Sequence, residues 1–157
     1  MPEPTDLANK LRAEGERFVN FFSALTDAQW QMDVYTEDSL WTVRNVLAHF
    51  VTSERGLLKL FEQIRLGGAG AADDFSIDRY NARQQEKSRE LTPVELLEQY
   101  KSVRANAVTW VAGLQESELE IRGRHPFLGQ TTLREMIKIL YIHNQTHYRD
   151  LKKALNL

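Results

Sequence analysis

Cysteine is absent from the 157-residue sequence. Disulfide bonds, thiolate metal ligands and cysteine nucleophiles are therefore excluded. The N-terminal residues Met1 to Asp6 also lack the basic and apolar stretches of a secretory signal peptide, so no signal peptide is expected. Together these absences fit the reducing cytoplasm, and a cytoplasmic location is the expectation.

Long hydrophobic runs and an excess of positive charge are missing as well. No apolar run approaches the roughly 20 residues that a membrane-spanning helix needs. The formal net charge is -2, and the Lys and Arg residues are spread along the chain. Because nucleic acids and membrane surfaces are bound through clustered basic residues, neither is expected as a partner.

Amphipathic helical patterns fill most of the chain. Apolar side chains recur at spacings of three, four or seven residues, which is the repeat of one helix face. The long helices predicted from this repeat span about 6–25, 42–66, 92–114 and 132–157. A shorter polar helix is predicted at about 78–89. The connecting segments predicted to be loops span about 26–40, 67–75 and 123–129, the last with a short extended stretch.

Capping signals mark the starts of two of these helices. Thr92 precedes Pro93 and is followed three residues later by Glu95, and Thr132 and Glu135 repeat the same spacing. No strand pattern is convincing, and no change of composition divides the chain. The sequence therefore predicts one all-α domain over residues 1–157, a four-helix bundle.

The sequence has four histidines, at positions 49, 125, 143 and 147. His143 and His147 are four residues apart, which places both imidazoles on one helix face, one turn apart. They continue the apolar stripe to which Leu140 and Leu151 belong, so they are predicted to face the bundle interior. His49 is predicted to lie on the inward flank of its own helix.

A divalent metal ion would satisfy three inward imidazoles at once, and histidine is the commonest nitrogen ligand of such ions. Three neutral ligands leave coordination positions open for water or substrate, which favours a chemical role over a closed structural site. Zn²⁺, Ni²⁺ and Fe²⁺ all accept imidazole, and the ligand set does not select among them. The alternative is a purely structural bundle whose buried histidines bond to backbone carbonyls and bind no metal.

Two acidic residues follow the histidines closely in the sequence. Glu54 comes five positions after His49, and Asp150 comes three positions after His147. Either carboxylate is a candidate to accept a ring N–H and orient its imidazole. The alternative for both is an ordinary solvated acid on a helix face.

Three segments resemble the signatures of the DinB-like (DinB/YfiT) superfamily. Leu40 to His49 is similar to its W-[ST]-v-x-x-v-l-a-H motif, and Ile142 to Leu151 is similar to its H-n-x-x-H-x-x-x-L motif. Phe75 to Asn81 resembles the D-x-[FY]-N stretch that lies between them. The order and spacing of these motifs match over nearly the whole chain.

The resemblance implies a fold and a metal site. The fold is an up-down-down-up four-helix bundle with a long crossover between the second and third long helices and a short extra helix. The metal site consists of His49, His143 and His147 at one end of a cleft, and all three positions are intact here.

Three further residues are candidates for the walls of this cleft. The resemblance implies that Asn81 faces the cleft, although a helix-capping or loop asparagine is the alternative. Trp41 is a candidate to line it, although an aromatic residue just before an N-cap also serves as a hydrophobic staple. Tyr141 stands close to the histidines as a candidate donor to a substrate, with ordinary bundle packing as the alternative.

The superfamily includes S-transferases that use bacillithiol or mycothiol, the metal-binding domain of a mycothiol-dependent maleylpyruvate isomerase, and a hydrolase that opens a reactive cyclopropane. Many members are homodimers. The resemblance therefore implies a metal-dependent thiol S-transferase or hydrolase, in which a low-molecular-weight thiol co-substrate or water attacks a small-molecule electrophile. No catalytic residue beyond the three ligands can be named. The alternative is a non-catalytic stress-response protein that binds a metal or a small molecule.

Overall fold

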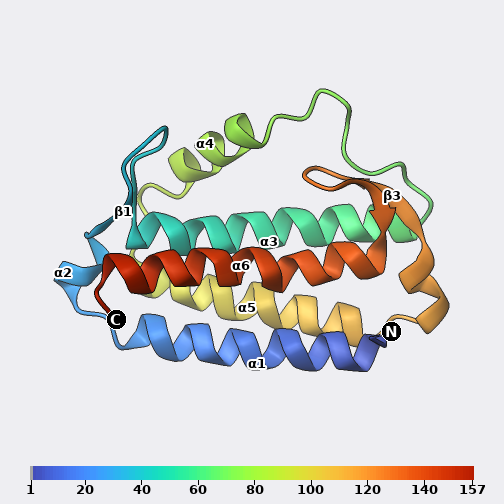
Figure 1. Ribbon diagram of the computed structural model, residues 1–157, viewed down its shortest axis with the longest axis horizontal. Helices are drawn as coiled ribbons and strands as arrows, with labels where there is room; N and C mark the ends of the chain where they lie inside the picture. The colour runs from blue at the N-terminus through green and yellow to red at the C-terminus, as the bar shows by residue number, and fades with distance from the viewer. Residues whose placement is uncertain (1) are drawn as a thin grey trace.

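The computed structural model, described here for residues 2–157, is a bundle of four long helices with smaller elements on one side (Figure 1). The long helices are α1 (Pro4–Ser23), α3 (Val43–Arg65), α5 (Pro93–Ala112) and α6 (Leu133–Ala154). Within these residues, every helix is too short or too polar to cross a lipid bilayer. The predicted long helices are present, with ends that differ by a few residues.

Threonine side chains start three of the long helices. Thr42, Thr92 and Thr132 each accept a hydrogen bond from the backbone N–H three residues ahead, which satisfies one of the free donors of the first turn. The capping patterns read from the sequence at residues 92–95 and 132–135 therefore mark real helix starts. Each helix then buries its apolar stripe against its neighbours.

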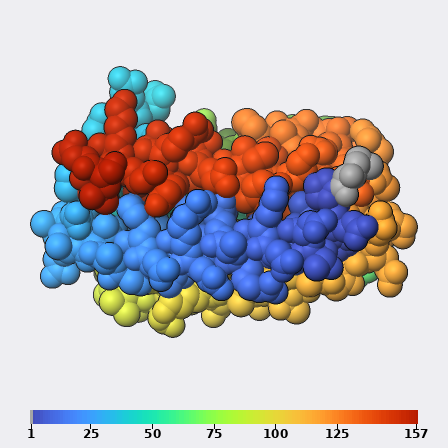
Figure 2. Space-filling model, turned by 60° about the horizontal axis from the view of Figure 1, so that its bottom comes forward, coloured from blue at the N-terminus to red at the C-terminus, as the bar shows by residue number. Residues whose placement is uncertain are grey.

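The four helices run up, down, down and up. In Figure 1, α1 and α6 run in one direction, and α3 and α5 run in the other. The helix pairs in contact are α1 with α5, α5 with α3, α3 with α6 and α6 with α1, so the bundle closes into a ring. Figure 2 shows α1 lying between α6 and α5. The predicted four-helix bundle topology is confirmed.

A long crossover joins α3 to α5 and carries the short helix α4 (Ile77–Lys87), in agreement with the sequence. α4 packs on α3: the Tyr80 hydroxyl donates to the backbone carbonyl of Thr52 at 3.0 Å. Gly56 permits this contact, because a Cβ atom there would collide with the Tyr80 hydroxyl. The crossover thus covers the outer face of α3.

The segments predicted as loops contain more regular structure than the sequence indicated. Residues 26–40 include the short helix α2 (Asp27–Trp30) and the strand β1 (Asp33–Tyr35), which pairs antiparallel with β2 (Trp41–Thr42). A second antiparallel hairpin is formed by β3 (Arg122–His125) and β4 (Gly129–Thr132), after a 3-10 helix η1 (Glu116–Glu120). Strands of two to four residues are too short to show an alternating pattern, so only their pairing reveals them.

The interior consists of two apolar clusters with a buried charged layer between them. One cluster is built around Phe18, Phe50 and Tyr100, and the other around Leu11, Phe61 and Leu140. The charged layer consists of Glu14, Glu54 and Arg104, all at most 4% exposed. We call these three residues the charged layer; they come from α1, α3 and α5 and tie those helices together at mid-height.

Candidate metal centre

The rings of His49, His143 and His147 converge between α3 and α6. The Nε2 atom of His143 lies 3.3 Å from Nε2 of His49 and 3.0 Å from Nε2 of His147. All three potential ligand atoms lie within 4.8 Å of one another. His49 is buried, and the other two rings are half-buried, so the group sits at the edge of the interior with one open side.

A tyrosine and a carboxylate fix the ring of His147. The Tyr35 hydroxyl lies 2.5 Å from Oδ2 of Asp150 and 2.7 Å from Nδ1 of His147. Because an ionised carboxylate can only accept, the hydroxyl donates to Asp150, and Nδ1–H of His147 donates to the hydroxyl oxygen. The proton of the neutral ring is therefore on Nδ1, and Nε2 presents a lone pair to the other two histidines.

Burial keeps all three imidazoles neutral. It lowers the pKa of His49 well below the ordinary value of 6.5, and repulsion from the other two rings lowers it further. Burial also lowers the pKa of His143, and it lowers the pKa of His147 to about 4, with repulsion from His143 adding to the effect. Neutral imidazole is the form that binds a metal, so the ligands are ready at ordinary pH.

Of the predicted wall residues, Trp41 lies beside a histidine. The Trp41 ring lies 4.9 Å from the His49 ring, centroid to centroid, and 6.2 Å from the Tyr35 ring. β1 and β2 therefore form an aromatic wall at this end of the site. Asn81 lies half-buried on α4, which packs over the face of α3 that carries His49.

Asp150 takes the orienting role that was expected of it, through Tyr35 rather than directly. Glu54 does not: its carboxylate accepts from Nε and Nη2 of Arg104 at 2.9 and 2.8 Å, inside the charged layer. The reason is helical phase, since five residues turn a helix by about 140° beyond a full circle and carry the side chain away from His49.

Tyr141 faces away from the histidines. Its buried ring packs against α1, where Lys10 Nζ lies 5.4 Å from the ring centroid. Two residues turn a helix by about 200°, so Tyr141 and His143 point to opposite sides of α6. Tyr141 is therefore a bundle-packing residue, the alternative already weighed for it.

Tyr35 is the site residue that sequence reasoning missed. It lies 112 positions from His147, in a segment predicted to be a loop. The sequence signal for it is local: an apolar pair at Val34 and Tyr35 and another at Leu40 and Trp41 flank an acidic turn.

Comparison with protein families adds an independent line of evidence. The family model of the DinB superfamily matches residues 4–151, nearly the whole chain and all three histidines. The chain belongs to the DinB superfamily. No curated protein matches the sequence with significance.

Two solved structures share the fold of this DinB-superfamily chain. An uncharacterised protein from Clostridium difficile 630 superposes with a TM-score of 0.76 at 14% identity, covering 100% of this chain and 98% of that one. YfiT from Bacillus subtilis, described as a probable metal-dependent hydrolase with an unusual four-helix bundle topology, gives a TM-score of 0.71 at 17% identity. That match covers 96% of this chain and 83% of YfiT.

The three imidazoles fit a divalent metal ion. Ligand nitrogens about 2.0–2.1 Å from an ion in tetrahedral geometry lie about 3.3 Å from one another, and at right angles they lie about 2.9 Å apart. The separations of His143 Nε2 from the other two Nε2 atoms, 3.3 and 3.0 Å, fall in this range, and all three ligand atoms lie within 4.8 Å of one another. Where two Nε2 atoms present lone pairs to each other at such a distance they repel, and a cation between them removes that repulsion. The donor set of this DinB-superfamily site is therefore suited to one divalent ion.

Proposed function

We propose that the protein is a metal-dependent enzyme that acts on a small electrophile, with His49, His143 and His147 holding the ion. The observation that carries the proposal is the convergence of three Nε2 atoms, one of which is fixed as a lone-pair donor by Tyr35. The three-histidine cluster, the family and the hydrolase description of YfiT all support a divalent metal. A bound divalent ion would lower the pKa of water or of a thiol and so supply the nucleophile.

The surrounding residues position the reaction rather than perform it. Asp150 and Tyr35 hold the His147 ring, and the Trp41 ring packs beside the His49 ring. In the thiol reaction, sulfur would form a bond to the electrophilic carbon, the leaving group would depart with the electron pair, and the thiol proton would pass to solvent. Hydrolysis would follow the same course with water in place of the thiol.

Metal content tests the ligand set. We expect about one divalent ion per chain in protein purified without chelator, and its loss from His49→Ala and His147→Ala variants. His125→Asn is the matched control. Because His125 lies outside the triad, this variant should keep its metal. Elemental analysis makes the measurement, and stoichiometric metal in both triad variants would disprove the proposed ligands.

Turnover separates an enzyme from a binding protein. A specific observation favours the binding alternative: the only carboxylate bonded to the triad within residues 2–157 is Asp150, through Tyr35, and it accepts from that hydroxyl. We expect thiol transfer to chlorodinitrobenzene or hydrolysis of nitrophenyl acetate that ends when a chelator is added. Tight metal binding without either reaction would instead support the sequestering role. The proposal includes a homodimer, which light scattering can check.

A further inference from the structure

Three apolar side chains close to the metal centre are only half-buried. Leu57 and Leu60 lie on α3 and Ile139 lies on α6, each within about three turns of a triad histidine. We call these three residues the apolar row. On α3 the side chains of Glu54 and Phe61, which flank Leu57, are at most 2% exposed. The exposure is therefore local to the place where the apolar row stands.

Helical phase places the apolar row on the same side as the triad. Leu60 differs from His49 by about 20° around α3, and Leu57 differs from it by about 80°. Ile139 differs from His143 by about 40° around α6. Because α3 and α6 pack side by side, these side chains share the seam between the two helices with the metal ligands. A ligand at the ion therefore has half-buried apolar side chains beside it.

Neighbouring elements close the other directions around the triad. On the side of the β1–β2 hairpin, the Trp41 ring lies 4.9 Å from the His49 ring and the Tyr35 ring lies 5.7 Å from the His147 ring. On the side of α4, Tyr80 lies against the α3 backbone. A ligand held at the ion would therefore extend along α3 towards its C-terminal end, where the apolar row lies.

The β3–β4 hairpin limits the length of the row. Gly123 packs so closely that a Cβ atom there would collide with the Ile64 side chain, and the His125 ring lies 6.3 Å from the Phe61 ring. The stretch of α3 from residue 53 to residue 60 is about 10 Å long at 1.5 Å per residue. The row thus has space for an extension of roughly this length.

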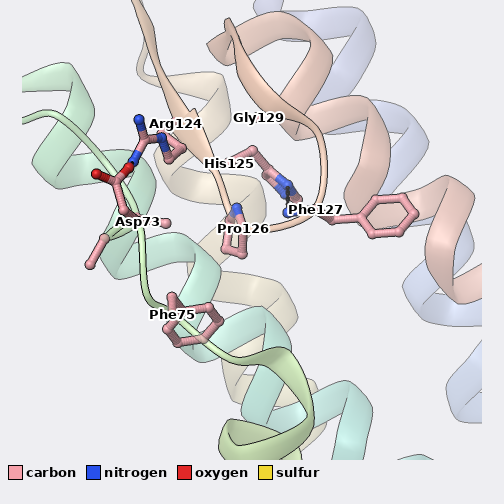
Figure 3. Close-up of a pocket in the computed structure, with 9 residues that line it drawn as sticks. Asp73, Phe75, Arg124, His125, Pro126, Phe127 and Gly129 are labelled. Carbon is pink, nitrogen blue, oxygen red and sulfur yellow. Dashed lines mark hydrogen bonds and ion pairs between the residues drawn. The ribbon is translucent and has the colours of Figure 1, made fainter.

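A separate cavity of about 270 Å³ lies between this hairpin and the crossover that precedes α4 (Figure 3). Its lining comes from residues 71–75 and 124–129 and includes no member of the apolar row. The ion pair of Arg124 with Asp73 stands on its wall. Because charged groups lose hydration when an apolar group covers them, an apolar ligand is not expected there.

Polarity changes along α3 with distance from the triad. Ser53 lies one turn beyond His49, about 40° away in phase, and is half-buried. The neighbouring Thr52 is buried and returns its hydroxyl to the carbonyl of Ala48 at 3.0 Å. The leucines of the apolar row follow Ser53. A ligand with a polar end at the ion and an apolar extension matches this order.

We propose that the apolar row binds the non-reacting part of the substrate, an apolar extension of up to about 10 Å whose polar end is held at the metal centre. Leu57, Leu60 and Ile139 act here as specificity-determining residues. That the ligand is a substrate rests on the proposed function, whereas the binding of an apolar extension does not.

The test uses acetohydroxamate, butyrohydroxamate and hexanohydroxamate, which share a metal-chelating head and differ in the length of the alkyl tail. Methyl NMR titration of zinc-loaded protein with labelled Leu and Ile side chains gives the dissociation constants. It also locates the tail, which we expect at Leu57, Leu60 and Ile139. Affinity should rise about two- to fourfold for each methylene that the row buries. In chelator-treated protein all affinities should fall while the dependence on tail length remains.

Substitutions on the two helices test the row itself. Ile139→Asn should lower the affinity of hexanohydroxamate relative to acetohydroxamate about fivefold or more, and should leave acetohydroxamate binding unchanged. Ile142→Asn is the matched control, because Ile142 is 45% exposed on the same helix and differs from His143 by about 100° in phase. Leu60→Ala is a second variant on α3, and it should lower the same ratio about threefold.

The outcomes distinguish this inference from the proposed function. A dependence on tail length that persists after chelator treatment supports the apolar row even if the protein has no turnover. Equal affinities for the three probes, or a ratio unchanged in both Ile139→Asn and Leu60→Ala, would overturn the inference. Neither result would alter the metal content or the turnover by which the proposed function is judged.

Discussion

Tyr35 is the residue on which the orientation of the metal centre turns. Its hydroxyl is the only group that joins a carboxylate to a triad ring among residues 2–157. Burial raises its pKa, as does the hydrogen bond to Asp150, so it stays a neutral donor at any pH the protein would meet. It thereby holds His147 in one tautomer.

Replacing Tyr35 by Phe should weaken metal binding without unfolding the protein. Loss of an orienting partner behind a ligating histidine typically reduces metal affinity about 10–100-fold. Competition with a chelating dye measures the dissociation constant. Tyr80→Phe is the matched control, because it removes a half-buried hydroxyl that contacts Thr52 and no histidine. Equal metal affinities in the two variants would show that the hydrogen bonds of Tyr35 to His147 and Asp150 do not contribute to metal binding.

Sequence spacing correctly predicted the part of the site that lies on a single helix. His143 and His147 differ by about 40° in helical phase, and Asp150 lies about 60° from His147, so local periodicity places them together. Applied strictly, the same arithmetic directs Glu54 and Tyr141 away from the site. The structure shows both side chains pointing away from the histidines. Tyr35 lay beyond such reasoning, because its contact depends on how a short hairpin folds against α6.

Among the elements, α4 depends on one glycine of α3. Gly56 lets the Tyr80 ring approach the α3 backbone closely enough for its hydroxyl to reach Thr52. Gln85 adds a second attachment, since its Nε2 donates to the carbonyl of Asn45 at 2.8 Å. α4 has no buried residue of its own, so these polar contacts and few others hold it in place.

The variant Gly56→Ala should loosen α4 while leaving the bundle intact. The added methyl displaces the Tyr80 hydroxyl, whereas alanine favours the α3 helix by up to about 1 kcal/mol. We expect faster amide hydrogen exchange in residues 77–87 and a global unfolding free energy within about 1 kcal/mol of the parent. Gly113→Ala provides the comparison, because a Cβ there makes only ordinary contacts. Unaltered exchange in α4 would mean that Tyr80 is not its anchor.

The sequence predicted helices well and hairpins poorly, for a physical reason. A helix such as α6 repeats its pattern over six turns, so each apolar position reinforces the next. β1 has three residues and β2 has two, and their pairing is stabilised by the bundle surface beneath them. No local pattern carries that information.

At the scale of the whole molecule, the charged layer sets the pH dependence of stability. Arg104 faces two glutamates, and Glu14 also accepts from Gln145 at 3.2 Å. Burial raises the pKa of Glu14 to about 7, although Arg104 opposes the shift. Between pH 4.5 and 7 the folded state therefore keeps a proton that the unfolded chain has lost, and stability falls as pH rises through this window.

The variant Glu14→Gln should not lose stability through Glu14 as the pH rises through this window. The amide imitates the protonated acid, so the variant should exceed the parent at pH 8 by on the order of 1–3 kcal/mol and differ little at pH 4. Urea unfolding of chelator-treated protein makes the comparison. The triad histidines, whose pKa values are lowered, add the opposite slope below pH 6.5, which both proteins share. Glu16→Gln, exposed on the same helix, should show no such difference; a parallel pH profile for Glu14→Gln would contradict the assignment.

The crossover between α3 and α5 has a consequence for protein engineering. A break near Gly67 would leave α1 and α3 on one fragment and α5 and α6 on the other, and every major helix contact joins the two. Within either piece the two long helices do not pack on each other, so we expect the four-helix core to form only when the pieces meet. Because His49 would sit on one piece and His143 with His147 on the other, capture of a coloured cobalt ion would report their reassembly.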